Sequence, residues 1–390
     1  MTAKKVIGKL HLWLGLASGL IVFVVALTGC LYAFQAEIQD ATQPYRFVRA
    51  ENRPTLPPSK LRAIADAQLP GKHAHSVNYA EPGRSAAVIY YSLSDTYYYG
   101  VYLNPYTGQV LNVTNYNETF FRWVINGHYY LWLPPTIGQP IVATGTLVFV
   151  LMLLSGLVLW WPKNRNAAKQ RFSINWSARW RRVNYDLHNV FGFYVLIVGL
   201  VLGLTGLVWG FQWFAKAVYW STSGGKALSM YAEPLSDTTR MGIQRSQPAT
   251  DLLWRRLVQQ EPTLKSVEVH FPETKTSSIL ISTNALHDNT SRTDFRFYDQ
   301  HTLAEQTVTH PYGRYHQAST ADKIARLNYD IHTGAVWGLP GKLLMFFASL
   351  ICASLPVTGT IIWWGRRSKA KPVRSKVPKR KPAIKAVAQE

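Results

Sequence analysis

The chain has 390 residues, of which 47% are hydrophobic and only 16% are charged. An ordinary soluble protein has about 25% charged residues, so this composition argues against one. Lys and Arg number 42 against 21 Asp and Glu, a net charge of +21, which fits nucleic-acid binding, an anionic membrane surface or charges flanking membrane spans. The two cysteines are too few for a disulfide framework, and no C-x-x-C-H motif is present for covalent haem attachment.

Four uncharged runs are each long enough for the roughly 20 apolar residues that a membrane-spanning helix needs. They cover residues 10–36, 123–162, 187–215 and 343–365. We therefore predict a polytopic α-helical membrane protein. Its four transmembrane helices are expected near residues 10–35, 139–161, 188–214 and 341–364.

The basic residues are distributed as topology signals. Twenty of them, with only two acids, lie before the first span, in the 162–187 loop or in the 365–390 tail. The positive-inside rule makes these segments and both termini cytoplasmic, with 37–138 and 215–340 outside. For a Gram-negative bacterium this means the inner membrane and two periplasmic segments. The Lys-, Arg- and Pro-rich tail is expected to be disordered against anionic membrane lipid, and the argument for nucleic acid disappears.

One motif competes with this topology. The segment Leu27-Thr28-Gly29-Cys30 follows an apolar run and resembles a lipoprotein cleavage box, which would remove the first span and lipidate Cys30. The alternative is that its small residues allow close helix packing. We favour packing, because Thr-Gly recurs in the third span where the cysteine does not.

The chain is a tandem duplication. Leu10-His11, Leu27-Thr28-Gly29 and Phe34-Gln35 recur as Leu187-His188, Leu204-Thr205-Gly206 and Phe211-Gln212, all at an offset of 177 residues. His128, Ser155-Gly156 and Trp160-Trp161 recur as His332, Thr358-Gly359 and Trp363-Trp364, at offsets of 204 and 203. Each repeat therefore contains a helix, an outside segment and a second helix.

The outside segments also repeat. Residues 59–69 and 250–260 have helical periodicity, and alternating strand-like runs follow at 87–91, 97–103, 278–282 and 294–298. Each segment is predicted to form a small α+β module. Asn104-Pro105-Tyr106-Thr107-Gly108 predicts a hairpin turn in the first module, and the second has Asp299-Gln300-His301-Thr302 without the glycine.

Four of the eleven histidines occupy equivalent positions at the head of a span or its approach. The topology places His11 and His188 together at the cytoplasmic surface, and His128 and His332 together at the outer surface. Two imidazole pairs at two depths suit two bis-histidine b-type haems. The alternative is that each histidine is an interfacial anchor, but intramembrane ionisable groups favour function.

A basic residue stands six positions before each histidine. These residues are Lys5, Arg122, Arg182 and Arg326. Each is a candidate partner for a haem propionate, or alternatively a snorkelling or topological charge. Asp186 and Asp330 stand two residues before a histidine. Each is a candidate to accept a hydrogen bond from the imidazole of the other repeat or, as we favour, to cap a helix start or accept local hydrogen bonds there.

These motifs resemble the PepSY-associated transmembrane family, and within it the bacterial inner-membrane ferric-siderophore reductases. The resemblance rests on Leu10-His11, on Asn-Tyr-Asp-Leu-His188, on Asp-Ile-His332-Thr-Gly and on the Asn104–Gly108 hairpin. It implies two PepSY-like periplasmic modules and a di-haem b protein that carries electrons outward to Fe(III) in a periplasmic siderophore complex. His11, His128, His188 and His332 carry over as the ligands. Asn104 replaces the usual acidic residue of the hairpin.

The sequence leaves the electron donor and two alternative functions open. It has no G-x-G-x-x-G, P-loop or H-E-x-x-H motif, so electrons would come from a membrane quinol or a cytoplasmic reductase. One alternative is a haem reductase for another periplasmic acceptor. The other is a non-enzymatic regulator or scaffold that acts through its PepSY-like modules and holds no haem. No residue is assigned as catalytic.

Overall fold

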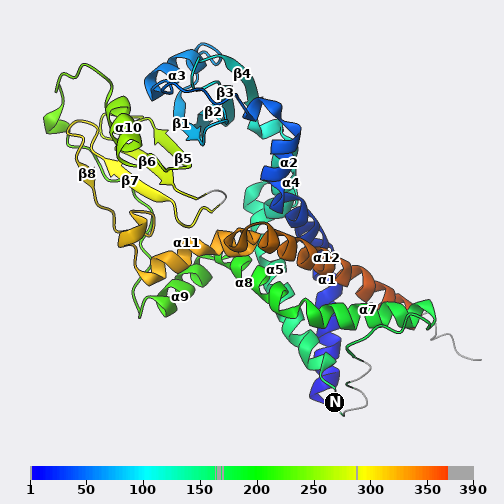
Figure 1. Ribbon diagram of the computed structural model, residues 1–390. Helices are drawn as coiled ribbons and strands as arrows, with labels where there is room; N and C mark the ends of the chain where they lie inside the picture. The colour runs from blue at the N-terminus through cyan, green and yellow to red at the C-terminus, as the bar shows by residue number, and fades with distance from the viewer. Residues whose placement is uncertain (1, 163, 165–167, 169–170, 287–288, 368–390) are drawn as a thin grey trace, which may run out of the picture.

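The computed structural model describes residues 2–162, 164, 168, 171–286 and 289–367. A helical part carries the N-terminus at one end, and a β-sheet lies at the other end (Figure 1). The basic tail predicted to be disordered lies almost entirely outside the described residues, as do several residues of the 162–187 loop.

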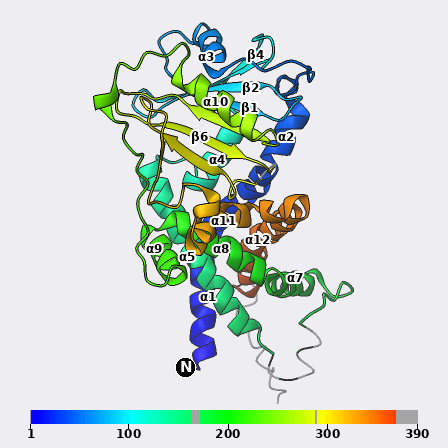
Figure 2. The same ribbon diagram turned by 60° about the vertical axis from the view of Figure 1, so that its left-hand side comes forward.

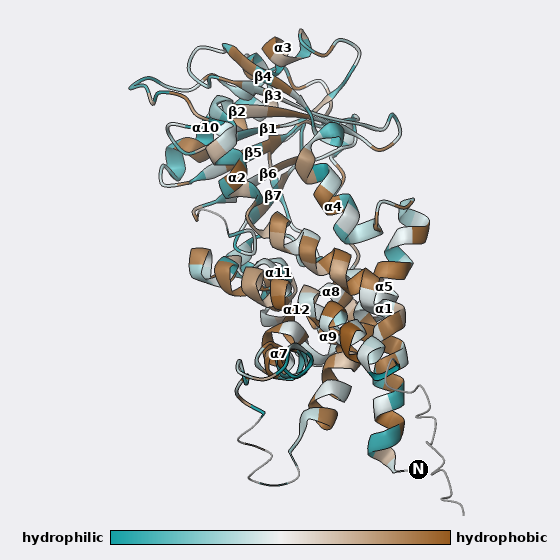
Figure 3. Ribbon diagram, turned by 90° about the vertical axis from the view of Figure 1, so that its right-hand side faces the viewer, coloured by the Kyte–Doolittle hydropathy of each residue, from teal (hydrophilic) through white to brown (hydrophobic). Residues whose placement is uncertain are grey.

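Three helices in the described part of the chain are long and apolar enough to cross a membrane. They are α1 (Ala3–Ala33), α5 (Pro135–Trp160) and α12 (Gly338–Arg367). Hydrophobic residues dominate these helices (Figure 3), and they agree with three of the predicted spans. A short helix, α2 (Gln35–Thr42), follows α1 after a break at Phe34. The chain is therefore membrane-embedded.

The helix predicted near residues 188–214 is broken in the structure. The structure has α7 (Trp180–Tyr194) and α8 (Leu196–Gly210), bent by 63° at Val195, and then α9 (Gln212–Thr222). Neither helix alone is long enough to cross a membrane, but α7 and α8 together are long and apolar enough. No proline marks the bend, and hydropathy counts apolar residues without sensing direction, so the sequence pattern could not reveal it.

The outer histidines stand on short helices just before the spans. These are α4 (Phe120–Tyr130) and α11 (Thr320–Thr333), which end in left-handed residues at Leu131 and Gly334. An added Cβ on Gly138 or Gly341 would lie 2.1 Å from a backbone carbonyl oxygen of the preceding turn, so only glycine fits. The two tight turns place His128 and His332 where the spans α5 and α12 begin.

The outside segments form one antiparallel sheet rather than two separate modules. Its strand order is β4-β3-β2-β1-β5-β6-β7-β8. The first repeat supplies β1 (Ala74–Ala80), β2 (Ala86–Ser92), β3 (Tyr97–Leu103) and β4 (Val110–Asn115). The second supplies β5 (Ser266–His270), β6 (Ile279–Asn284), β7 (Asp294–Tyr298) and β8 (Glu305–Gln306). The halves join where β1 pairs with β5, with Val77 opposite Val269.

Two helices, α3 (Pro58–Asp66) and α10 (Ala249–Gln260), cover one face of this sheet. The core between them and the strands contains Leu61, Leu253, Val77 and Val269, all buried. Asp251 ties the helices together by accepting bonds from the Ser59 amide at 2.9 Å and the Ser59 hydroxyl at 2.5 Å. Because strand residues alternate between faces, polar residues of β1 and β5 such as Asn78 and Glu268 lie on the other face and line a cleft towards the helical part. Figure 2 shows the sheet above the helical part.

The predicted hairpin turn after β3 is present. Asn104 Oδ1 accepts the Tyr106 amide at 2.9 Å, and Gly108 has a left-handed φ of +79°. In the second repeat Leu303 takes the left-handed conformation, with φ +62°, although it is not a glycine. The remaining short elements are 3₁₀ turns at Pro44–Arg46, Tyr116–Glu118, Thr238–Arg240, Tyr315–Gln317 and Ala335–Trp337.

Cys30 lies inside α1 and is buried against α12. Its side chain is 2% exposed, and its thiol lies 3.3 Å from the Phe346 carbonyl oxygen. This position packs Cys30 against α12.

Candidate functional site

The structure brings the two outer histidines together. The ring centres of His128 on α4 and His332 on α11 lie 6.1 Å apart. Trp209 of α8 meets the His332 ring edge-on, with ring centres 5.2 Å apart. The contact expected from the repeat between His128 and His332 is therefore present.

A hydrogen bond to Nδ1 orients each outer histidine. His128 Nδ1 lies 2.8 Å from the Val25 carbonyl oxygen, which can only accept, so Nδ1 carries the hydrogen. His332 Nδ1 lies 2.8 Å from the Thr205 hydroxyl, whose own hydrogen goes to the Val201 carbonyl at 2.6 Å. The hydroxyl therefore accepts from the imidazole. In both neutral rings, Nε2 is left with a free lone pair.

The inner histidines repeat this arrangement. His11 Nδ1 lies 2.9 Å from the Ser155 hydroxyl, and His188 Nδ1 lies 2.9 Å from the Thr358 hydroxyl. Ser155 donates to the Met152 carbonyl at 3.1 Å, and Thr358 donates to the Ser354 carbonyl at 3.0 Å. Each hydroxyl again has only a lone pair to offer the imidazole. All four histidines thus present Nε2 in the form that binds a metal.

The glycine after each of these hydroxyl residues makes room for the imidazole ring. An added Cβ on Gly29 would lie 3.1 Å from His128 Cε1, and one on Gly359 would lie 3.3 Å from His188 Cε1. The corresponding distances are 3.5 Å from Gly156 to His11 and 3.8 Å from Gly206 to His332. The repeated Ser/Thr-Gly pairs therefore provide the space in which the four imidazole rings lie, although the sequence analysis had assigned Thr-Gly to helix packing. We call each pair the seat of its histidine.

Two asparagines that the sequence analysis did not select reinforce these seats. Asn184 Nδ2 donates to the Thr358 carbonyl at 3.1 Å, and Asn328 Nδ2 donates to the Thr205 carbonyl at 3.1 Å. Each asparagine stands four residues before a histidine, so it lies on the same helix face. The near repeat of the Arg-x-Asn-Tyr-Asp-x-His motif was the available signal for them.

The four basic candidates have separate surroundings. Lys5 is exposed in the first turns of α1. Arg182 pairs with the buried Asp186 at 2.9 Å, and the Arg122 guanidinium lies 5.1 Å from the centre of the Tyr98 ring. Arg326 is buried and donates to three backbone carbonyls, those of Pro311, Thr293 and Gly313. Its observed contacts hold two loops of the second repeat in place.

The aspartates do not contact an imidazole in these surroundings. Asp186 accepts from Arg182 and, at 3.3 Å, from the Asn175 amide. Asp330 is fully buried and accepts from the Thr290 amide and hydroxyl and from the Ser291 amide. Their contacts satisfy backbone amides and a neighbouring arginine, as expected of local hydrogen-bond acceptors rather than of partners for an imidazole.

A cavity of about 330 Å³ opens beside the outer histidine pair. His128 and His332 line it with Gly29, Gly206 and Trp209. A larger cleft of about 1,100 Å³ lies between the sheet and the helical part. Asn78, Glu268 and Asn284 line its sheet side, and Trp209, Tyr219 and Tyr329 line its helical side. Trp209 and Tyr329 border both spaces, so they separate the cleft from the outer histidines.

Protein side chains alone do not enclose a metal ion in the described part of the chain. No group of three or more His, Cys, Asp or Glu residues there is arranged to hold one.

Comparison with known sequences identifies the family. A search of curated protein sequences finds no match to this chain. The model of the PepSY-associated TM region matches residues 9–366, which is nearly the whole chain and includes all four histidines. The chain therefore belongs to the PepSY-associated TM region family.

Proposed function

We propose that this protein is a di-haem b electron-transfer protein of the bacterial inner membrane that reduces ferric iron in periplasmic siderophore complexes. His128 and His332 would hold one haem, and His11 and His188 the other. The observation that carries the proposal is the set of four Nδ1 hydrogen bonds, each of which leaves Nε2 free for iron.

The separation of the outer pair is compatible with one metal ion between the two rings. Two imidazoles that bind one metal at about 2 Å, with about 1 Å more to each ring centre, have ring centres at most about 6 Å apart. The observed separation of His128 and His332 is 6.1 Å. A haem bound in this way supplies a one-electron couple whose potential depends on the ligands and their burial.

The residues around each ligand have separate tasks. Thr205, Thr358 and Ser155 accept the imidazole N–H and so keep the ring turned towards the cofactor. The glycines leave space for the rings. Asn184 and Asn328 bond the backbone carbonyls of Thr358 and Thr205 and so fix the position of these hydroxyl residues relative to the histidines. Among the bases, Arg122, Arg182 and Lys5 remain candidates for propionate binding. Arg326 is the weaker candidate because its guanidinium already serves three carbonyls.

The topology supplies a direction for the electron. With the basic segments cytoplasmic, the inner pair lies at the cytoplasmic face and the outer pair at the periplasmic face. The bent pair α7 and α8 would be the fourth span, which makes four in total. The two halves of the sheet would be the periplasmic PepSY-like modules. The donor remains a membrane quinol or a cytoplasmic reductase.

The cleft is our proposed position for the ferric complex. Its volume of about 1,100 Å³ suits a bulky ligand, and its wall at Trp209 touches the His332 ring. Delivery of one electron converts Fe(III) to Fe(II), which binds hard oxygen ligands such as hydroxamates less strongly and is released.

A reduction assay tests this function. The purified protein, reduced with dithionite and freed of excess reductant, is mixed anaerobically with a ferric trihydroxamate and a ferrous chelator. We expect the haem bands to reoxidise while the ferrous chelate forms in equal electron equivalents. Haem that stays reduced would favour the reductase for another acceptor, and a protein without haem would favour the regulator or scaffold.

A further inference from the structure

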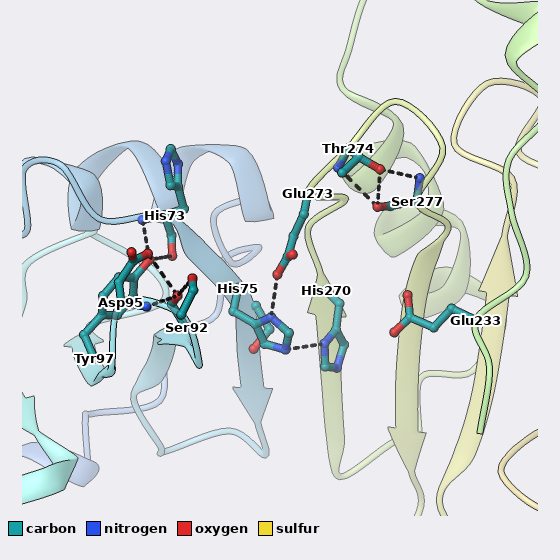
Figure 4. A network of polar contacts seen from close by, with 12 residues as sticks. His73, His75, Ser92, Asp95, Tyr97, Glu233, His270, Glu273, Thr274 and Ser277 are labelled. Carbon is teal, nitrogen blue, oxygen red and sulfur yellow. Dashed lines mark hydrogen bonds and ion pairs between the residues drawn. The ribbon is translucent and has the colours of Figure 1, made fainter. Parts of the chain in front are cut away.

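Two further histidines face each other at the strand pair that joins the halves of the sheet. His75 lies on β1 and His270 ends β5, and His75 Nε2 is 3.2 Å from His270 Nδ1. Figure 4 shows the two rings pointing towards each other from neighbouring strands. Neither belongs to the four histidines of the spans, and 195 residues separate them in the sequence.

Carboxylates lie on the outer side of both rings. Glu273 Oε1 is 3.6 Å from His75 Nδ1, and Glu268 Oε1 is 3.8 Å from His270 Nε2. The Ser76 hydroxyl donates to the same Glu268 oxygen at 2.6 Å and fixes its position. Neither distance is that of a hydrogen bond, but the negative charge of the carboxylates favours the tautomers with the hydrogen on the outer nitrogens. In those tautomers two lone pairs face each other and can bind one cation between the rings.

The angle between the rings favours a metal ion over a shared proton. The ring centres are 5.0 Å apart and the ring planes cross at 88°. A linear N–H···N bond with the observed 3.2 Å between nitrogens would place the ring centres about 5.5 Å apart, which is more than the observed 5.0 Å. The two nitrogen lone pairs therefore point to a position beside the line that joins the nitrogens. Two metal–imidazole bonds of about 2.0–2.1 Å at a tetrahedral angle place the nitrogens about 3.3 Å apart. The observed 3.2 Å matches this value.

Charge and access are also suitable. Glu233 adds a third carboxylate, which interacts electrostatically with His270 and points towards that ring in Figure 4. The side chains of His75 and His270 are 33% and 22% exposed, so an ion can enter and water can complete its coordination. Imidazole ligands suit Zn²⁺, Cu²⁺, Fe²⁺ and Ni²⁺ rather than Mg²⁺ or Ca²⁺.

We propose that His75 and His270 chelate a divalent first-row transition-metal ion at the seam between the two halves of the sheet. With only two protein ligands the site is open and exchangeable. Glu268, which lies 3.8 Å from His270 Nε2, also lines the large cleft, so the ion would lie next to that cleft. If the proposed function holds, the ion bound here is Fe(II) released by reduction. The metal site itself does not depend on that function.

Metal binding to the full-length protein in detergent tests the site. Equilibrium dialysis against Zn²⁺, and anaerobically against Fe²⁺, is followed by metal analysis with excess Mg²⁺ present. We expect one bound ion per chain at this exchangeable site. Affinity should fall at least tenfold in His75→Ala and His270→Ala and stay unchanged in His73→Ala, a matched control whose side chain points away from the pair (Figure 4). His75→Gln and His270→Gln, which retain a polar side chain, repeat the test if an alanine variant is unstable.

The outcomes separate this site from the proposed function. Equal affinity in the wild type and the His75 and His270 variants, or no binding to the wild type, overturns the site whatever the haem content. One ion per chain in a protein without haem would support the site and remove the Fe(II) identity.

Discussion

His332 and Thr205 form the hydrogen bond that best explains how a span of this protein holds a histidine. Nδ1 of His332 donates to the Thr205 hydroxyl at 2.8 Å, and that hydroxyl donates onward to its own helix. The same relation joins His188 to Thr358 and His11 to Ser155. Duplication has therefore preserved an imidazole, its acceptor and a ring-sized gap as one unit.

Removal of the Thr205 hydroxyl should weaken haem binding at the outer site. In Thr205→Val, His332 Nδ1 loses its acceptor, and loss of a hydrogen-bond partner of a metal-binding histidine typically lowers metal affinity about 10–100-fold. Thr28→Val is the matched control, because His128 bonds mainly to the Val25 carbonyl at 2.8 Å and lies 3.4 Å from the Thr28 hydroxyl. Haem titration of the purified variants measures both affinities. Equal losses in the two variants would contradict the assigned acceptors.

Alanine substitution at the glycines should have graded effects. The added Cβ of Gly29→Ala would meet His128 Cε1 at 3.1 Å, whereas that of Gly206→Ala would meet His332 Cε1 at an ordinary 3.8 Å. We expect Gly29→Ala to move the ring and to shift the reduction potential or lower the haem content. Gly206→Ala should resemble the wild type. Redox titration distinguishes them, and the reverse order would refute the role of these glycines.

Loss of the asparagine amide should lower stability. Asn328→Leu removes the bond to the Thr205 carbonyl, which is worth about 0.5–1.5 kcal/mol in typical proteins. The expected result is a lower Tm for the full-length protein in detergent. Asn189 is a suitable comparison, because it bonds only its own helix, at the Tyr185 carbonyl, in the contacts described for it. An Asn189→Leu variant that loses as much stability as Asn328→Leu would count against the seat.

The stability of the outer sheet should depend on pH through Glu261. Hydrogen bonds from Arg296, at 2.7 and 2.8 Å, hold the pKa of Glu261 below its usual value of 4.5. A lowered folded-state pKa adds stability that is fully present above the unfolded-state pKa and is lost as pH falls through the folded-state value. Glu261→Gln should therefore lower Tm at pH 7, and the gap from the wild type should shrink below about pH 4.5. A gap independent of pH would contradict this pairing.

The sequence was sufficient to select His11, His128, His188 and His332 as candidates and to predict that His128 and His332 lie close together. Their ring centres are 6.1 Å apart in the structure. The sequence was not sufficient for the partners of Nδ1, because Thr205 and His332 are 127 residues apart and lie on different helices. Thr-Gly was visible, but small residues pack helices so often that packing was the simpler interpretation.

Two features of the fold were beyond reach for other reasons. The bend at Val195 has no proline to signal it, and apolar composition is the same in a straight or bent helix. β1 and β5 are the edge strands of the two halves of the sheet, and nothing in their alternating pattern marks them as partners. That pairing also created the His75–His270 contact, which no local motif announces.

The central claim is that the four histidines bind two haems, and an absorption spectrum tests it most directly. Oxidised and dithionite-reduced spectra, with haem per chain, are recorded for the full-length protein and for His11→Ala, His128→Ala, His188→Ala and His332→Ala. We predict b-type bands at about two haems per chain, with one haem lost in both outer variants and the other in both inner variants. A colourless protein after expression with ample haem, or four variants that keep both haems, would contradict the account.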